Sequence, residues 1–291
     1  MKVSATKTQF CHQTWSSESH IQLLKRQEGV TYVVTENTPF HPVSHIWPDH
    51  PADRGHGEVS GQQYPVIDCL VGAVELESGE LYVGESIPVK RDAEGWVFVV
   101  VHCLSADLTV TADTSIKWVV DQDYQESLSR GHSAGHFAFL ALNKVLAEQY
   151  WRKDADRKDS LGHYDFNSYA QETSFVTPDL CTDTYRLGKT LKKRGLNVAD
   201  VLADLVEIER KVNHQLEMWF DDTIDVNMRL EGESLTDSRY WECEIREAGS
   251  VSIPCGGTHV KSTAELGRIR VCLTQLDAQN IQMQTHVDGK S

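Results

Sequence analysis

Two short motifs in this chain carry side chains that can bind a metal. The first runs from His132 to His136 and reads HSAGH, and the second runs from Cys255 to His259 and reads CGGTH. In each motif three residues separate the two candidate ligands, so on a helix both would lie on one face, one turn apart. Three imidazoles and one thiolate form a borderline-soft donor set that suits zinc best. The sequence therefore predicts one zinc site, if the fold brings the motifs together.

Each motif taken alone also has an ordinary explanation. Two histidines at this spacing are often a packed or solvated pair on a helix surface. The two glycines inside CGGTH allow the backbone to turn tightly around a bound group, which favours the metal site. A rival set of possible ligands lies in one loop. It comprises His41, His45, His50 and His56. Pro42 disfavours a helix that presents the first two together, so exposed histidines, or histidines at the mouth of an active site, are the alternatives.

The amino-acid composition is typical of a globular chain of one or two domains. Of its 291 residues 40% are hydrophobic and 24% are charged, and no run of about eighteen apolar residues predicts a membrane span. The N-terminal stretch MKVSATKTQFCHQ lacks the apolar core of a signal peptide, so we expect a cytoplasmic protein. Seven irregularly spaced cysteines do not resemble a disulfide framework, which leaves Cys255 reduced and able to bind metal.

The net charge of the chain limits the kinds of partner that it can bind. A formal charge of −15 repels polyanions as a whole, so we expect neither DNA nor a membrane as a partner. Basic clusters at residues 152–158 and 189–194, and a third set of Lys261, Arg268 and Arg270, could still contact phosphates. A cluster of this kind is more often an ordinary solvated surface, so charge neither establishes nor excludes RNA. The sequence leaves the oligomeric state open.

Apolar patterning divides the chain at about residue 123. Residues 1–123 are rich in β-branched and aromatic runs separated by turn signals, which predicts a small β-barrel. The strands expected there are Val30–Thr35, Tyr64–Val74, Leu81–Val83, Trp96–Leu104 and Leu108–Val110.

Residues 124–291 mix the two kinds of element, which makes the fold class α+β. A helix is expected over 132–150, and a longer one with Asp200 as N-cap and an apolar stripe that ends at Trp219. Residues 151–199 are polar and give no clear pattern. Further strands are expected at Tyr240–Ile245, Val251–Ile253 and Ile269–Leu273.

The second motif and its neighbours resemble a known family. The string CGGTHVKSTAELG at 255–267 resembles the CGGTHV-x-x-T-x-E-x-G signature of the editing domain of alanyl-tRNA synthetases, shared with free-standing alanyl-tRNA editing proteins and related to the threonyl-tRNA synthetase editing domain. Arg130 followed by HSAGH is similar to the family's R-x-H-T/S-A-x-H helix, and residues 207–213 are similar to its I-E-x-x-V-N helix. Asp165 and Phe166 resemble an aspartate–phenylalanine pair that opens a strand in that family.

The first half shows the same resemblance at Thr38–Pro42 and Asp53–Gly55, which are similar to a T-x-F-Y/H-P…DRG element. The resemblance implies a translation-factor-like antiparallel β-barrel over 1–123 and a two-layer α/β editing domain over 124–291. It implies a zinc-dependent hydrolase that contacts the tRNA acceptor end and removes serine or glycine from alanine tRNA. The ligase catalytic domain is missing from this sequence, so we expect it to act in trans.

One departure from the family concerns the loop before Asp53. The family has a glycine-rich stretch that ends in Gly-Gln-Pro, whereas residues 43–52 contain no glycine. Glycines of this kind usually let the backbone approach a ligand closely. Two alternatives therefore stand beside trans-editing: a zinc hydrolase of the same fold that acts on a small ester or amide, and a non-catalytic protein with a closed zinc site.

The catalytic groups beside the metal are less defined. Four protein ligands would close a tetrahedral zinc, so hydrolysis needs one weak ligand or a five-coordinate metal. The glutamate of the HExxH metalloproteases is absent, since Ser133 follows the first histidine. Asp53, Arg54 and Glu265 are candidates for proton transfer or orientation, while Ser133 and Thr258 could line an amino-acid pocket. A surface or structural role is the alternative for Asp53, Arg54 and Glu265, and local capping or hydrogen bonding to the backbone is the alternative for Ser133 and Thr258.

Overall fold

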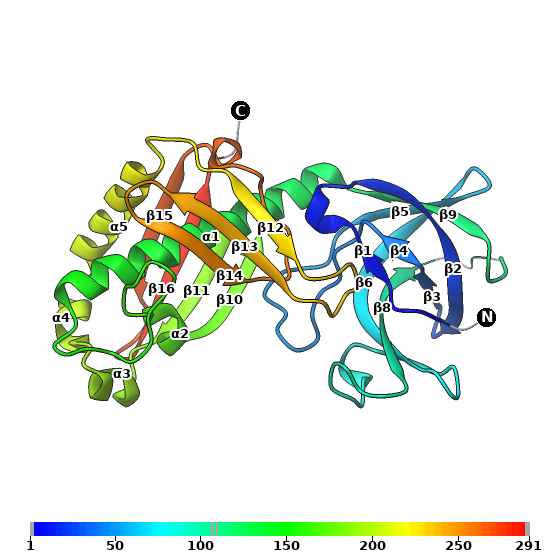
Figure 1. The fold of residues 1–291 in the computed structure, drawn as a ribbon, viewed down its shortest axis with the longest axis horizontal. Helices are drawn as coiled ribbons and strands as arrows, with labels where there is room; N and C mark the ends of the chain where they lie inside the picture. Colours follow the sequence, from blue (N-terminus) through cyan, green and yellow to red (C-terminus); the bar gives the residue numbers. More distant parts are fainter. Residues whose placement is uncertain (1–2, 106–107, 109, 289–291) are drawn as a thin grey trace. The chain divides into compact units, whose positions relative to one another are not determined.

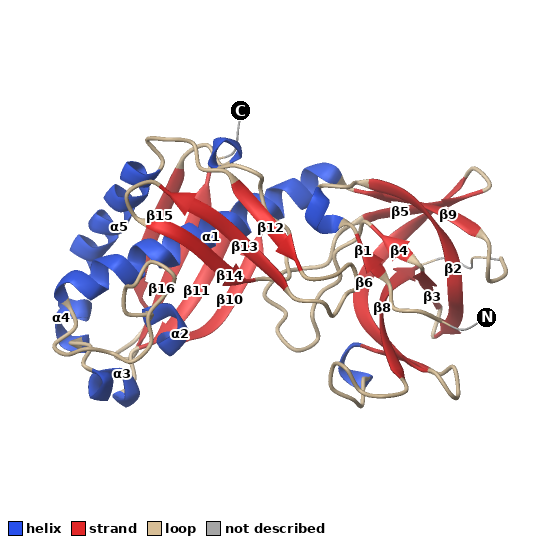
Figure 2. Ribbon diagram, in the orientation of Figure 1, coloured by secondary structure: helices blue, strands red, loops and turns tan. Residues whose placement is uncertain are grey.

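The computed structural model describes residues 3–105, 108 and 110–288. It is a mixed α/β structure, rich in sheet and with few helices, which confirms the mixed class expected from the sequence (Figures 1 and 2). The chain forms two compact units. The first consists of Met1–Gln125, Leu230–Arg239 and Gly256–Thr258, and the second of Glu126–Arg229, Tyr240–Cys255 and His259–Ser291.

The first unit is built on a seven-stranded sheet of order β5-β9-β2-β3-β8-β6-β7. Strand β5 pairs with both β9 and β6, so six strands form an unbroken circuit of antiparallel neighbours and β7 lies outside it. Strands β1 (Lys7–Thr8) and β4 (Asn37–Thr38) form a separate parallel pair. The sheet consists of β2 (Ser16–Gln27), β3 (Val30–Thr35), β5 (Gly55–Val59), β6 (Gln62–Glu75), β7 (Leu81–Val83), β8 (Trp96–Leu104) and β9 (Ser115–Val120).

Strand predictions in this half are confirmed where apolar residues dominate. β3, β7 and β8 have the predicted bounds, and β6 contains the predicted Tyr64–Val74. Strand β2 was not predicted because charged and polar residues alternate with few buried ones along it. The strand expected at Leu108–Val110 includes residue 109, which lies outside the described residues.

The second unit contains two sheets, of which the four-stranded one is antiparallel throughout, and most of the helical residues. One sheet has the order β10-β11-β16-β15 and the other β12-β13-β14. The strands are β10 (Gln171–Thr177), β11 (Leu180–Arg186), β12 (Val226–Leu230), β13 (Arg239–Ile245), β14 (Gly249–Pro254), β15 (Ile269–Gln275) and β16 (Asn280–Val287). The helices are α1 (Gln122–Gln149), α2 (Phe166–Ala170), α3 (Lys189–Arg194), α4 (Val198–Ala203) and α5 (Leu205–Trp219).

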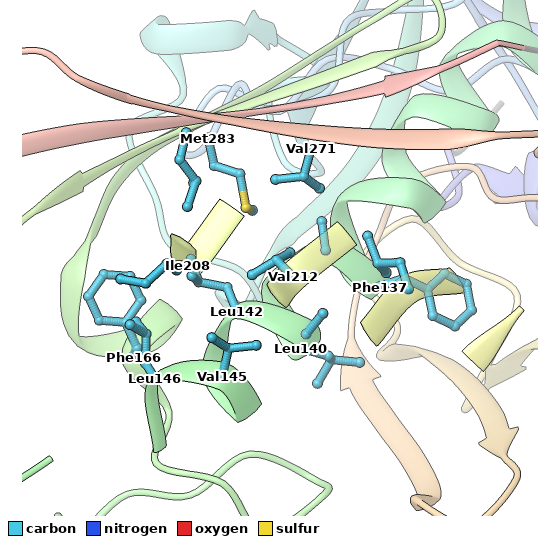
Figure 3. Close-up of a cluster of buried hydrophobic side chains, with 14 of the residues drawn as sticks. Phe137, Leu140, Leu142, Val145, Leu146, Phe166, Ile208, Val212, Val271 and Met283 are labelled. Atoms are coloured by element: carbon cyan, nitrogen blue, oxygen red, sulfur yellow. The ribbon is translucent and has the colours of Figure 1, made fainter. Parts of the chain in front are cut away.

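Helices α1 and α5 pack on the four-stranded sheet through one apolar cluster. Figure 3 shows Leu142 of α1 together with Ile208 and Val212 of α5, near Val271 of β15 and Met283 of β16. All five side chains are essentially inaccessible to water. Burial of this cluster is the main favourable contribution to the packing of the two helices against the sheet.

Two polar side chains of α5 cover the free edge of β15. The Asn213 side chain donates to the Val271 carbonyl and accepts from the Val271 N–H, both at 2.8 Å, and Glu209 accepts from the Leu273 N–H at 2.7 Å. These bonds satisfy backbone groups that an edge strand would otherwise leave unpaired. The I-E-x-x-V-N pattern of α5 is therefore explained by the architecture of this unit.

Helix boundaries differ from the sequence prediction in two places. The helix expected over 132–150 begins ten residues earlier, at Gln122. The helix expected from Asp200 is two helices, α4 and α5, which are separated at Asp204. Aspartate is a weak helix former because its short side chain bonds elsewhere, and Asp204 accepts a hydrogen bond from Tyr150 at 3.2 Å.

In the described ranges, every helix is too short or too polar to cross a membrane.

Asp165 also differs from expectation. It was expected to open a strand, but it is the N-cap of α2 and accepts from the Ser168 N–H at 3.0 Å. Strand β10 begins only at Gln171, directly after that helix. The Asp side chain therefore satisfies a helix N-terminus, which is the position where aspartate is favoured.

Two glycines allow α1 to approach the β10–β11 hairpin closely. A Cβ atom at Gly131 would lie 2.8 Å from the backbone nitrogen of Leu180 and 2.9 Å from the Thr177 carbonyl oxygen. A Cβ atom at Gly135 would lie 2.7 Å from the sulfur of Cys181. Because the atoms facing Gly131 belong to the backbone, no side chain can move aside to make room.

We therefore expect Gly131→Ala to destabilise the protein by about 1–3 kcal/mol, the usual cost of an overpacked site. In an unobstructed helix the same change would stabilise by about 1 kcal/mol, so the sign of the effect is diagnostic. Glu148→Ala, which introduces alanine at an exposed position of the same helix, is the control. Urea unfolding of both variants measures the difference, and a Gly131→Ala protein more stable than wild type would contradict the close packing.

Candidate metal centre

The four predicted ligands lie together in the second unit. His132 and His136 project from one face of α1, Cys255 follows the end of β14, and His259 follows four residues later. One ligand atom from each lies within 4.8 Å of every other. Within the described ranges this is the only group of three or more His, Cys, Asp or Glu side chains with such geometry, and it could hold a metal ion.

Two distances within the group are close to those between the ligands of a tetrahedral ion. The Sγ atom of Cys255 lies 3.5 Å from Nε2 of His132 and 3.1 Å from Nε2 of His259. With Zn–S near 2.3 Å and Zn–N near 2.0–2.1 Å, sulfur and nitrogen ligands of a tetrahedral zinc lie about 3.5 Å apart. The Nε2 atoms therefore face the sulfur at nearly the separation that a shared zinc would give.

His136 supplies an independent test of the fit. It is buried and stacks on Trp241, with ring centroids 5.0 Å apart and 14° between the planes. Among the described residues neither of its ring nitrogens has a hydrogen-bond partner. Burial lowers the pKa of His136 to about 3, so the ring is neutral and has a lone pair available for a metal. Buried polar atoms are rarely left without a partner, and a metal ion would supply one here.

Ser133 lies behind His259 and fixes its orientation. The Oγ atom of this fully buried serine is 3.0 Å from Nδ1 of His259 and accepts from the Val260 N–H at 3.1 Å. A neutral imidazole that offers Nε2 as a ligand carries its proton on Nδ1, which then donates to Ser133. These bonds would suit a residue that orients His259 toward a metal, and the amino-acid pocket suggested for Ser133 stays a prediction.

Thr258 is buried in the first unit and is bonded to His50. Nδ1 of His50 lies 2.9 Å from the Pro51 carbonyl oxygen, which can only accept, so Nδ1 carries the proton. Burial lowers the pKa of His50 to about 4, and the neutral ring therefore offers Nε2 as an acceptor. The Thr258 hydroxyl, 3.1 Å away, donates to it. This bond holds the residue that immediately precedes His259 in the chain.

The rival set of loop histidines does not form a metal group among the described residues. His41 and His50 pack ring against ring, with centroids 4.3 Å apart. His56 instead lies 3.2 Å from a carboxylate oxygen of Glu58. Two of the four histidines are therefore packed in the interior of the first unit, and they are not solvated loop residues.

The remaining candidate groups are engaged in local structure. Asp53 is buried in the first unit, where it accepts from the His41 N–H at 2.7 Å and from the Gln125 amide at 2.6 Å. Its burial raises the pKa of the carboxyl to about 7. Arg54 lies over the ring of Tyr124, 4.0 Å from its centroid. Both side chains therefore have partners within their own unit.

Glu265 closes a capping box at the short 3₁₀ helix Thr263–Glu265. Its carboxylate accepts from the Lys261 N–H at 2.8 Å and from the Ser262 N–H at 3.1 Å. These two bonds are those of a capping box, so Glu265 contributes to local structure, and its part in proton transfer stays a prediction.

One neighbour of the metal centre was not identified from the sequence. Trp241, fully buried on β13, forms the wall against which His136 stacks. A signal was present in the strand itself, because Trp241, Cys243 and Ile245 alternate with polar residues and indicate one buried face. The pattern predicts burial but does not indicate which side chain the ring contacts.

Comparison with known proteins gives a distant relationship. No protein-family model matches the chain. It shows weak homology to alanine–tRNA ligases: 24% identity over 198 residues for Methanothermobacter thermautotrophicus, 23% over 261 for Idiomarina loihiensis and 22% over 279 for Saccharolobus islandicus. These alignments cover 64%, 86% and 89% of the chain. The chain spans only 18%, 23% and 28% of the respective ligases.

The orienting position of Ser133 can be tested by metal affinity. We expect Ser133→Ala to weaken zinc binding about 10- to 100-fold, because His259 loses the partner of its Nδ1 proton. Ser133→Thr keeps a hydroxyl and should retain most of the affinity, and Ser168→Ala at an exposed site is the control. Competition with a chromogenic zinc chelator provides the measurement. Equal affinity of Ser133→Ala and wild type would refute the orienting role.

Proposed function

We propose that this protein is a zinc-dependent hydrolase that removes serine or glycine from wrongly charged alanine tRNA, acting on tRNA that a separate ligase has charged. The observation that carries the proposal is the group of three histidines and one cysteine from two motifs distant in sequence. Weak homology to alanine–tRNA ligases and the resemblance of both motifs to an editing domain support the same substrate.

The proposed architecture has two domains. Residues 1–123 would form the small antiparallel translation-factor-like barrel, and the circuit of six paired strands in the first unit supports this assignment. Residues 124–291 would form the two-layer editing domain, supported by the packing of α1 and α5 on the four-stranded sheet.

The reaction is the hydrolysis of an ester between an amino acid and a ribose hydroxyl. Water adds to the carbonyl carbon, the bond from that carbon to the ribose oxygen breaks, and the ribose oxygen takes up a proton. A zinc ion, when bound, would polarise the ester carbonyl or lower the pKa of a water molecule toward about 7.

The chain's own contribution is to hold and orient the donor atoms. His136 is kept neutral by burial, and Ser133 holds His259 with Nε2 toward the sulfur of Cys255. Three of the four ligands are buried and Cys255 is partly exposed, so the group is accessible from the side of the thiolate. Burial of the histidines against Trp241 excludes water from the opposite side.

Deacylation of seryl-tRNA of alanine type tests the proposal. We expect release of serine by the wild-type protein, and a loss of at least about 100-fold in His132→Ala, because the metal would lose a ligand. His214→Ala removes an exposed histidine from α5 and should keep full activity. Release of radiolabelled serine from the charged tRNA is the measurement.

Two other outcomes would each replace the proposal. Hydrolysis of free amino-acid esters without activity on any aminoacyl-tRNA would identify a small-ester hydrolase. Inert wild-type and His132→Ala proteins, together with unfolding on removal of zinc, would identify a closed structural site.

A further inference from the structure

We propose that a basic surface formed by residues 151–158 and helix α3 binds the phosphodiester backbone of the RNA substrate. The inference rests on the proposed function and adds the place where its RNA would dock. The two segments carry eight Lys and Arg side chains and two Asp, a net charge of +6 in a chain whose total is −15. We call them the basic surface.

The two segments are joined by hydrogen bonds, although about thirty residues separate them in the sequence. The Arg152 N–H donates to the Gly195 carbonyl at 2.8 Å, and Trp151 and Leu196 form an isolated bridge. Gly195 has a φ of +113°, a left-handed conformation that ends α3 and favours glycine. Arg194 and Asp156 form an ion pair at 2.5 Å. The two segments therefore lie next to each other in the fold.

Most cations of the basic surface are available to a ligand. Lys189, Lys192 and Lys193 are exposed, and among the described residues none of them lies within ion-pair distance of a carboxylate. The same holds for Arg152 and Lys153 of the other segment. A polyanion would therefore not have to displace existing ion pairs in order to reach these charges.

Nearby acidic side chains are already bonded. Asp154 accepts from the Tyr164 hydroxyl, and Asp156 accepts from the Tyr169 hydroxyl at 2.5 Å as well as pairing with Arg194. Beyond the C-terminal end of α3, Asp200 accepts from Asn197. The nearest carboxylates are therefore hydrogen-bonded to other side chains of the protein and do not pair with the exposed lysines of α3.

Aromatic rings hold part of the basic surface in place. The guanidinium of Arg194 lies over Tyr169, 4.4 Å from the ring centroid, and the ammonium of Lys158 lies 5.7 Å from that of Tyr164. The Tyr169 hydroxyl also accepts from the Arg157 N–H at 2.7 Å. Side chains held in this way lose less conformational entropy when a ligand binds.

The spacing of the lysines suits a nucleic-acid backbone. Lys192 and Lys193 lie three and four residues after Lys189 in α3, so each of them has its side chain about 5–6 Å from that of Lys189. Successive phosphates of a nucleic-acid strand lie at comparable separations, and such contacts depend on charge and not on base sequence. Because the rest of the chain is acidic, its field would confine a polyanion to this surface.

The test compares two variants with equal loss of charge. One carries Lys189→Gln, Lys192→Gln and Lys193→Gln, and its control carries Lys90→Gln, Arg91→Gln and Lys117→Gln at exposed positions of the first unit. Fluorescence anisotropy of a labelled alanine-type tRNA transcript is measured over a series of salt concentrations. We expect the α3 variant to bind about tenfold or more weakly and to lower the slope of log K against log salt by about two to three. The control should bind like wild type.

Kinetics separate docking from chemistry. The α3 variant should raise KM for seryl-tRNA by the same factor as its loss of affinity, leave kcat unchanged, and hydrolyse serine methyl ester at the wild-type rate. That last readout also shows that the variant is folded and holds its metal.

Each contrary result has one meaning. Equal tRNA binding by the α3 variant and wild type, or equal losses in both variants, would overturn the basic surface alone. Weaker binding of polyglutamate with unchanged tRNA binding would also overturn it, in favour of an acidic protein partner. A wild-type protein that hydrolyses the small ester but neither binds nor deacylates tRNA would overturn the proposed function together with this inference.

Discussion

The metal centre depends on one constraint, the burial of imidazoles whose nitrogen atoms need partners. His136 is neutral and buried, and among the described residues its two nitrogens accept and donate no hydrogen bond. Leaving a polar group in this condition costs about 1–3 kcal/mol, which a bound cation would offset. Its fellow ligands come from α1 and from the chain after β14, so metal binding would link a helix to a strand end and contribute to the folding of the second unit.

Some residues of the two motifs face the metal centre, and others allow the helix to pack closely against its neighbours. In HSAGH the histidines face the metal centre, while Gly135 and the preceding Gly131 face the β10–β11 hairpin and allow the helix to approach it. Ser133 connects the two motifs through its bonds to His259 and Val260. Ser133 would therefore matter as much as the ligands themselves, because its bond to Nδ1 of His259 leaves Nε2 to face a metal.

Hydrophobic periodicity in the sequence predicted the elements whose formation depends on nearby residues. The buried stripe of α5 and the apolar strands β3 and β8 follow directly from the periodicity of the sequence. Residue types and spacing singled out the four side chains that lie together and could hold a metal ion. The break at Asp204 and the capping role of Asp165 were missed because each depends on which hydrogen bond a short acidic side chain finally makes. The hydrogen bonds of Ser133 to His259 and Val260 were missed for a similar reason, since these partners lie 126 and 127 residues away in the sequence.

We expect these four side chains to bind one zinc ion through three nitrogens and one sulfur. X-ray absorption at the zinc K-edge of the purified protein measures this shell directly. The expected shell has nitrogen ligands at about 2.0–2.1 Å and a single sulfur at about 2.3 Å, and the sulfur signal should be lost in Cys255→Ser. A shell of oxygen and nitrogen without sulfur, or a protein purified and reconstituted without bound zinc, would contradict it.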